Sequence, residues 1–213
     1  MNAEVMVEAG SVRLPGLLGA PEGAQGTVVF AHGSGSSRLS PRNNAVAAEL
    51  RGAGLATLLF DLLTEAEGRD RANVFDIGLL AERLKDVVAW LDRQPGVAGL
   101  PLGCFGASTG AAAALRAAAQ LPERVAAVVS RGGRPDLAEA HLPEVTAPTL
   151  LIVGELDQTV VEMNQRALQL LGGEKALEIV PGATHLFEEP GAMEEVTRLA
   201  REWFVRFLAQ GAD

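Results

Sequence analysis

The sequence is poor in cysteine, in basic residues relative to acidic ones, and in long apolar runs. Cys104 is the only cysteine in 213 residues, so no disulfide can form within the chain. Its position in an apolar stretch predicts a small buried side chain rather than a reactive thiol. Lys and Arg total 18 against 27 Asp and Glu, a formal net charge of -9. This balance argues against nucleic acid as a partner, because phosphate binding needs clustered cations, and against an anionic membrane surface.

The sequence also lacks the usual targeting and membrane signals. Residues 1–10 contain no basic segment followed by a continuous apolar run, which a secretory signal peptide would need. No apolar run approaches the length of a membrane span. We therefore expect a cytoplasmic protein. Histidine is scarce as well, and its three copies, His32, His141 and His185, are the candidates for a catalytic base.

Apolar runs alternate with amphipathic stretches along most of the chain. This alternation predicts a single α/β domain over residues 1–213, with a mostly parallel sheet covered by helices on both faces. An alternating stretch at 5–14 predicts an edge hairpin whose end is marked by Pro15, Gly16 and Pro21, and the charged stretch 65–71 is typical of a solvated loop. Buried strands are expected near 27–31, 55–60, 124–130, 149–153 and 176–180 and just before Gly106, and helices near 41–52, 74–91, 161–171 and 196–207 and after Gly110.

The segment Gly106-Ala-Ser108-Thr-Gly110 follows one of the expected strands and precedes an alanine-rich helix. Its Gly-x-Ser-x-Gly pattern, in this context, is typical of a nucleophile elbow. A serine in such a tight turn has a strained backbone, so the residues two before and two after it must have almost no side chain. Ser108 is therefore the candidate nucleophile.

Two other expected strands end in residues that complete a catalytic triad. Asp157 lies in Gly154-Glu-Leu-Asp157, and His185 lies in Gly182-Ala-Thr-His185. The carboxyl ends of parallel strands form the ligand edge of such a sheet, and the order Ser, Asp, His is the one this arrangement uses. His185 would take the serine proton, and Asp157 would orient the imidazole and stabilise its charged form. His32 and His141 are weaker candidates for the base.

The loop His32-Gly33-Ser34-Gly35 follows the first long buried strand. An oxyanion hole needs the backbone N–H of the residue after the nucleophile, here Thr109, and a second N–H from this loop, for which we choose Ser34. A phosphate-binding loop is the alternative, but the segment lacks the Gly-Lys-Ser/Thr ending and the G-x-G-x-x-G spacing of such loops.

With these four motifs in this order, the chain resembles the α/β-hydrolase family over nearly its whole length. Among its members it looks most like the small, dienelactone-hydrolase-like enzymes. The resemblance implies an eight-stranded sheet whose first strands are antiparallel, and it carries the nucleophile, acid and base onto Ser108, Asp157 and His185. Typical dienelactone hydrolases have a cysteine nucleophile where this chain has serine. Segment 131–146 is too short for the helical lid of many members, which implies an open site.

The function that these observations indicate is hydrolysis of a carboxylic ester or thioester of a small molecule. No metal or organic cofactor is required. Arg38, Arg131 and Arg134 are expected near the rim of the site, where Arg131 either contacts an acidic substrate group or is an ordinary solvated arginine. Two alternatives remain open: a binding or sensing protein on the same fold, and an acyltransferase that uses an alcohol or amine in place of water. The composition carries no signal for an oligomeric interface.

Overall fold

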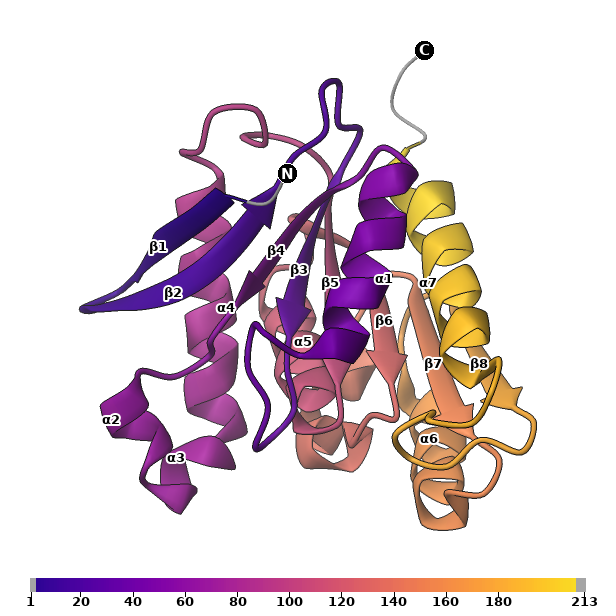
Figure 1. Cartoon of the computed structure of the whole chain (residues 1–213). Helices are drawn as coiled ribbons and strands as arrows, with labels where there is room; N and C mark the ends of the chain where they lie inside the picture. The colour runs from indigo at the N-terminus through magenta and orange to yellow at the C-terminus, as the bar shows by residue number, and fades with distance from the viewer. Residues whose placement is uncertain (1–2, 210–213) are drawn as a thin grey trace.

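Eight strands form one sheet in the order β1-β2-β4-β3-β5-β6-β7-β8, in a computed structural model that describes residues 3–209 (Figure 1). From β4 to β8 neighbouring strands are parallel, while β1 and β2 are antiparallel to their neighbours. The expected mostly parallel sheet with antiparallel first strands is confirmed. The strands are β1 Ala3–Ala9, β2 Val12–Gly19, β3 Thr27–Ala31, β4 Ala56–Phe60, β5 Leu102–Ala107, β6 Val125–Arg131, β7 Thr149–Gly154 and β8 Lys175–Val180.

Helices cover both faces of the sheet and bury a separate apolar layer on each (Figure 1). Helices α4, α5 and α6 lie on one face, whereas α1 and α7 pack side by side on the other. The central strands β3, β4, β5 and β7 are buried along their whole length, which explains why they are continuous apolar runs. The helices are α1 Pro41–Gly52, α2 Glu65–Gly68, α3 Arg71–Val74, α4 Ile77–Leu91, α5 Thr109–Gln120, the 3-10 helix η1 Pro135–Glu144, α6 Gln158–Leu170 and α7 Ala192–Leu208.

The edge hairpin is longer than its proline and glycine residues suggested. Strand β2 continues through Pro15, which is paired with Met6 of β1, and it ends at Gly19. Its ladder with β4 begins only at Gly16, so Pro15 lies where β2 is paired on one side. Proline is tolerated in strands at such half-paired positions, because its missing N–H leaves no ladder bond broken. Pro15 and Gly16 therefore do not end the hairpin, whereas Pro21, the third residue expected to mark its end, follows β2.

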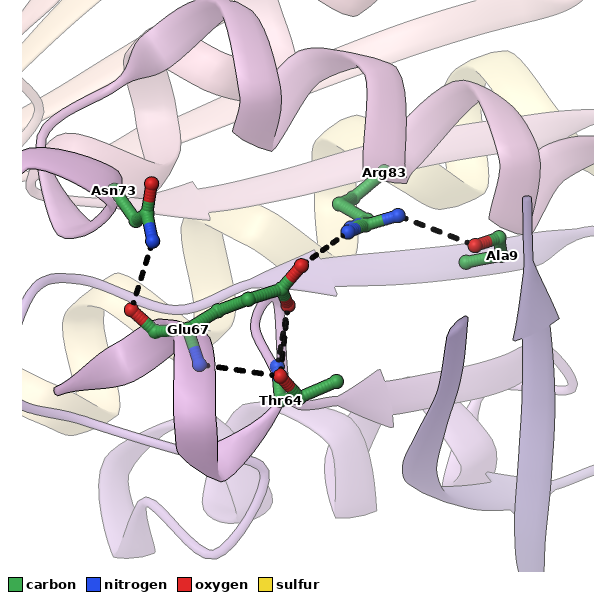
Figure 2. Close-up of polar contacts among 5 residues, drawn as sticks. All are labelled: Ala9, Thr64, Glu67, Asn73 and Arg83. Atoms are coloured by element: carbon green, nitrogen blue, oxygen red, sulfur yellow. Dashed lines mark hydrogen bonds and ion pairs between the residues drawn. The ribbon is translucent and has the colours of Figure 1, made fainter. Parts of the chain in front are cut away.

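The charged stretch 65–71 is largely exposed, as expected, but it is not a loop, because the short helices α2 and α3 occupy this region. Figure 2 shows the polar contacts that position them. Glu67 and Thr64 form a reciprocal capping box at the start of α2, and Asn73 donates to the Glu67 carbonyl at 3.1 Å. The carboxylate oxygen Oε1 of Glu67 accepts a hydrogen bond from Arg83 of α4 at 2.6 Å. A second guanidinium nitrogen of Arg83 donates to the Ala9 carbonyl at 3.2 Å. One arginine thus connects α2, α4 and the first hairpin.

Segment 131–146 does not form a large lid. Most of it is η1, which packs against α5 and α6, and no residue of η1 lines either cavity described below. Within residues 3–209, no helix is both long enough and apolar enough to cross a membrane.

Candidate active site

Ser108 lies at the turn between β5 and α5, in a backbone conformation that residues other than glycine rarely adopt. Its φ is 51° and its ψ is -120°, and within the described chain only one other non-glycine residue has a positive φ. The Ser108 N–H donates to the Arg131 carbonyl at 3.2 Å, and the Ser108 carbonyl accepts from the Arg134 N–H at 3.1 Å. Strain of this kind persists only where neighbours hold the backbone in place, and it is common at reactive residues.

The two glycines of the motif are required by the close packing around the turn. A Cβ on Gly106 would collide with the Cα of Ala111, and a Cβ on Gly110 would collide with the carbonyl oxygens of Ala31 and His32. Both glycines have ordinary negative φ values, so it is space and not backbone freedom that excludes a side chain. The Gly-x-Ser-x-Gly pattern thus follows from the contact of α5 with β3 and β5.

We expect the substitution Gly110→Ala to destabilise the protein by about 3 kcal/mol, the upper part of the range for overpacked interiors. The reason is that its methyl group would meet backbone atoms, which cannot move aside as a flexible side chain can. Gly52→Ala is the matched control, because a Cβ there meets nothing within 4 Å. Urea denaturation should separate the two variants clearly. Equal midpoints would contradict this explanation of the motif.

Asp157 and His185 are in direct contact at the same edge of the sheet. Nδ1 of His185 lies 2.6 Å from Oδ2 of Asp157. Asp157 occupies the N-cap position of α6, yet its side chain makes no capping bond there and is directed to the imidazole instead. A Cβ on Gly154 would collide with the carbonyls of Ala183 and Thr184, so this glycine allows the two loops to approach each other.

The loop that carries His185 is held at both ends. Before it, the Gly182 N–H donates to the carboxylate of Glu155 at 2.7 Å. The Glu189 carboxylate accepts from the N–H and the hydroxyl of Thr184, and these bonds hold the pKa of Glu189 below its usual range. After it, Phe187 has a φ of 55° and a fully buried ring. The imidazole therefore projects from a fixed loop, with its side chain 39% exposed.

Ser108 and His185 line one cavity of about 230 Å³. Within residues 3–209 no hydrogen bond joins the Ser108 hydroxyl to His185, as is common in ligand-free sites whose catalytic contacts tighten when substrate binds. A group seated in this cavity would meet the serine, the imidazole and two arginines. The lining residues are Gly33, Ser34, Ser36, Ser40, Arg42, Ala107, Ser108, Arg131, His185 and Leu186.

The structure also brings Ser34 and Thr109 together. The Ser34 N–H donates to the Thr109 hydroxyl oxygen at 2.9 Å, from two segments 75 residues apart. Thr109 is the first residue of α5, where a backbone N–H has no partner inside the helix. An oxyanion formed beside Ser108 would compete with the Thr109 hydroxyl for the Ser34 N–H.

The two remaining histidines make other contacts. His141 belongs to η1 and lies 3.9 Å from Glu144. His32 connects the ends of β3 and β4: its Nε2 accepts from the Leu62 N–H at 3.1 Å, and its Nδ1 lies 2.9 Å from the Gly33 carbonyl. Burial lowers the pKa of His32, although the Gly33 carbonyl and Asp61 oppose this effect. The neutral imidazole fits both contacts.

We expect acid to destabilise the protein through His32. Because its pKa is lowered on folding, the unfolded chain binds more protons, so the free energy of unfolding falls as the pH drops. The His32 contribution is complete above about pH 6.5 and is lost below it, down to the folded-state pKa. Urea denaturation between pH 5 and 8 should show a shallower pH dependence for His32→Gln than for the native chain. Identical slopes would assign the dependence to other groups.

The three arginines expected at the rim lie in different places. Arg134 forms an ion pair with Asp136 at 2.7 Å and lines neither cavity. Arg38 forms an ion pair with Asp61 at 2.6 Å and lines a larger cavity, of about 670 Å³, beyond the loop 33–36. This cavity is walled partly by α2 and its surroundings, and the sequence did not predict it. Arg131 is only 7% exposed, so its interpretation as a solvated surface arginine was wrong. Arg42, which shares its cavity, was not predicted at all.

Cys104 lies inside β5 and is fully buried, as expected for a packing residue. Burial raises the pKa of its thiol to about 12. A neutral thiol within the sheet is a poor nucleophile, since reactivity requires the thiolate.

This fold, with a strained serine beside an Asp–His pair at the carboxyl ends of its strands, defines the class as α/β hydrolase. A family described as alpha/beta hydrolase domain matches residues 24–201, and the chain belongs to this family. The crystal structure of a dienelactone hydrolase from Anabaena variabilis is 57% identical, with a TM-score of 0.94 and 98% of each chain covered. The protein is thus a dienelactone-hydrolase-like member, and its fold supports a hydrolase-type function.

Two further relatives differ in length and in similarity. Two strains of Mycobacterium tuberculosis have a protein named "Putative phosphoribosyl transferase" that is 63% identical over 207 residues, or 97% of this chain. The chain spans only 47% of the length of those relatives. Est1E from Butyrivibrio proteoclasticus has a TM-score of 0.84 with 97% of this chain and 99% of that one covered, and at 16% identity it shows the fold alone.

Proposed function

We propose that the protein is a serine hydrolase that cleaves a carboxylic ester or thioester of a small molecule. The observation that carries this proposal is that Ser108 and the Asp157–His185 pair lie at the same edge of the sheet. The strained Ser108 and His185 line a single cavity, and Asp157 is bonded to the His185 imidazole. The three residues follow three different strands. A carboxylate on Nδ1 leaves Nε2 of the imidazole to accept a proton, which is the arrangement a general base needs.

In the proposed mechanism, the Ser108 oxygen attacks the acyl carbon while His185 takes its proton. The N–H groups of Thr109 and Ser34 stabilise the resulting oxyanion, with the Ser34 N–H leaving its contact to the Thr109 hydroxyl. His185 then protonates the departing alcohol or thiol, and an acyl-enzyme remains on Ser108. Water, deprotonated by His185, attacks this ester, and His185 returns the proton to the Ser108 oxygen as the acid leaves. The triad itself needs no cofactor for these steps.

Acyl transfer to an alcohol or amine shares the first half of this mechanism. The open cavity favours water as the acceptor, because η1 does not cover it. The name of the Mycobacterium proteins raises phosphoribosyl transfer as another activity. Since this chain spans 47% of their length, we place that activity in the part of those proteins that the chain does not cover.

Rapid mixing with p-nitrophenyl butyrate tests the proposal. We expect a burst of about one equivalent of p-nitrophenol per chain where deacylation is the slower step, followed by steady turnover. Added hydroxylamine would trap the acyl-enzyme as a hydroxamate and so report this intermediate directly. A protein that binds the ester and releases no p-nitrophenol would instead support the binding or sensing alternative.

A further inference from the structure

Two arginines in the Ser108 cavity have no role in the proposed triad chemistry. Arg131 is the last residue of β6, and its carbonyl accepts the Ser108 N–H, so its backbone is fixed beside the nucleophile. Arg42 is the second residue of α1 and also lines this cavity. Both residues therefore line the cavity in which an ester at Ser108 would lie.

The positive charge of Arg131 is buried without an opposite charge. The residue is 7% exposed, its Nε is buried with no hydrogen-bond partner, and no carboxylate of the described chain forms an ion pair with it. Its polar contact is a long one, 3.4 Å to the Asn43 side-chain oxygen, and its guanidinium carbon lies 5.9 Å from the centre of the Phe187 ring. Burial lowers the pKa of Arg131 to about 10, and the charge of Arg42 adds to this effect.

Arg42 adds a second cation instead of compensating the first. Its Nε is also buried without a partner, while its terminal nitrogen lies 3.3 Å from the Glu188 carboxylate. Glu188 is 66% exposed, and such exposed pairs contribute little. The amino end of α1, capped by Ser40, opens on the same cavity and contributes the positive end of a 12-residue helix dipole.

We propose that Arg131, Arg42 and the amino end of α1 form a subsite for an anionic oxygen group, a carboxylate or a phosphate, carried by the substrate. The inference rests on the proposed function and specifies its substrate class. Two guanidinium groups in one cavity, of which only Arg42 has a carboxylate partner and that partner is exposed, are costly to hold together, and an anion that accepts hydrogen bonds from both would reduce this cost. A short substrate of this kind, such as the half-ester of a small dicarboxylic acid, would fit the cavity of about 230 Å³.

A matched pair of esters tests the subsite. Monoethyl succinate and ethyl 4-oxopentanoate have the same scissile bond and leaving group, and they differ in a carboxylate against an acetyl group. We expect a kcat/KM about 10- to 100-fold higher for the anionic ester, the range of a charge-assisted hydrogen bond. Arg131→Gln and Arg42→Gln should each reduce this preference several-fold, through a higher KM for the anionic ester. Arg93→Gln is the control for charge, because Arg93 is exposed and precedes the opposite end of β5.

Inhibition by inorganic phosphate and by acetate distinguishes the two anions. A lower inhibition constant for phosphate points to a phosphorylated substrate, and the reverse points to a carboxylate. Equal turnover of the two esters, unchanged in Arg131→Gln, would overturn the subsite while leaving the hydrolase intact. Arg42→Gln, on the surface of α1, serves if Arg131→Gln does not fold, and circular dichroism verifies folding in each case.

Direct binding separates failure of the subsite from failure of the proposed function. Calorimetric titration of monoethyl succinate into Ser108→Ala protein requires no turnover. Binding that disappears when Arg131→Gln or Arg42→Gln is added, but persists with Arg93→Gln, would support the subsite even if neither ester were hydrolysed. Binding that is unchanged by both Arg131→Gln and Arg42→Gln would overturn the subsite.

Discussion

Replacing Ser108 with alanine is expected to lower kcat for a short-chain ester by about 10⁶-fold, the loss seen when a triad serine is removed. The structural reason is that Ser108 supplies the atom that forms the acyl-enzyme, and the other side chains can only assist a slow attack by water. The residual rate should come from the oxyanion donors and substrate binding alone. Ester turnover at substrate saturation measures the effect directly.

Ser36→Ala is the matched control for this substitution. Ser36 lines the same cavity, so its removal changes the polarity of the wall without removing the nucleophile. We expect a loss of less than about tenfold, in line with one hydrogen bond. Turnover by Ser108→Ala at the native rate, or equal losses in the two variants, would refute the assignment of the nucleophile.

Asp157→Asn should lower kcat about 10⁴-fold and leave the fold unchanged, as the same change does in the serine protease triad. Oδ2 of Asp157 lies 2.6 Å from Nδ1 of His185, so it holds the proton on that nitrogen and leaves Nε2 to act as base. An amide nitrogen in its place would favour the opposite tautomer. It would also remove the charge that stabilises the imidazolium in the transition state.

Glu155→Gln provides the comparison on the same loop. Its carboxylate accepts the Gly182 N–H at 2.7 Å and so contacts the His185 loop without touching the imidazole. A glutamine can retain that bond through its carbonyl oxygen, so kcat should fall less than tenfold. If Glu155→Gln were as damaging as Asp157→Asn, the carboxylate of Asp157 would be acting through loop structure and not through the histidine.

The sheet could be predicted because its central strands are buried on both faces and therefore appear as continuous apolar runs. The helices on both faces follow from their amphipathic spacing, and Ser40-Pro41 marked the start of α1 correctly. The candidate triad could be placed for a related reason. Parallel strands align their carboxyl ends, so Asp157 and His185, far apart in the sequence, were expected at the same edge and lie in contact there.

The remaining features depend on contacts that one sequence does not reveal. Segment 65–71 is charged and was interpreted as a loop, although Thr64-Glu-Ala-Glu67 carries the capping-box spacing that could have indicated a helix start. The burial of Arg131 and the approach of Arg42 arise where the start of α1 meets the end of β6, an alignment set by packing. No periodicity or motif in the sequence indicates that these two charges share a cavity.

The most direct test of the proposed serine chemistry is intact-protein mass spectrometry after incubation with a fluorophosphonate. This probe reacts covalently with a serine only where a base and oxyanion donors activate it. We expect a single adduct on the native chain, localised to Ser108 by peptide mapping, and none on Ser108→Ala. No adduct on the native chain, or an adduct that persists in the variant, would contradict it.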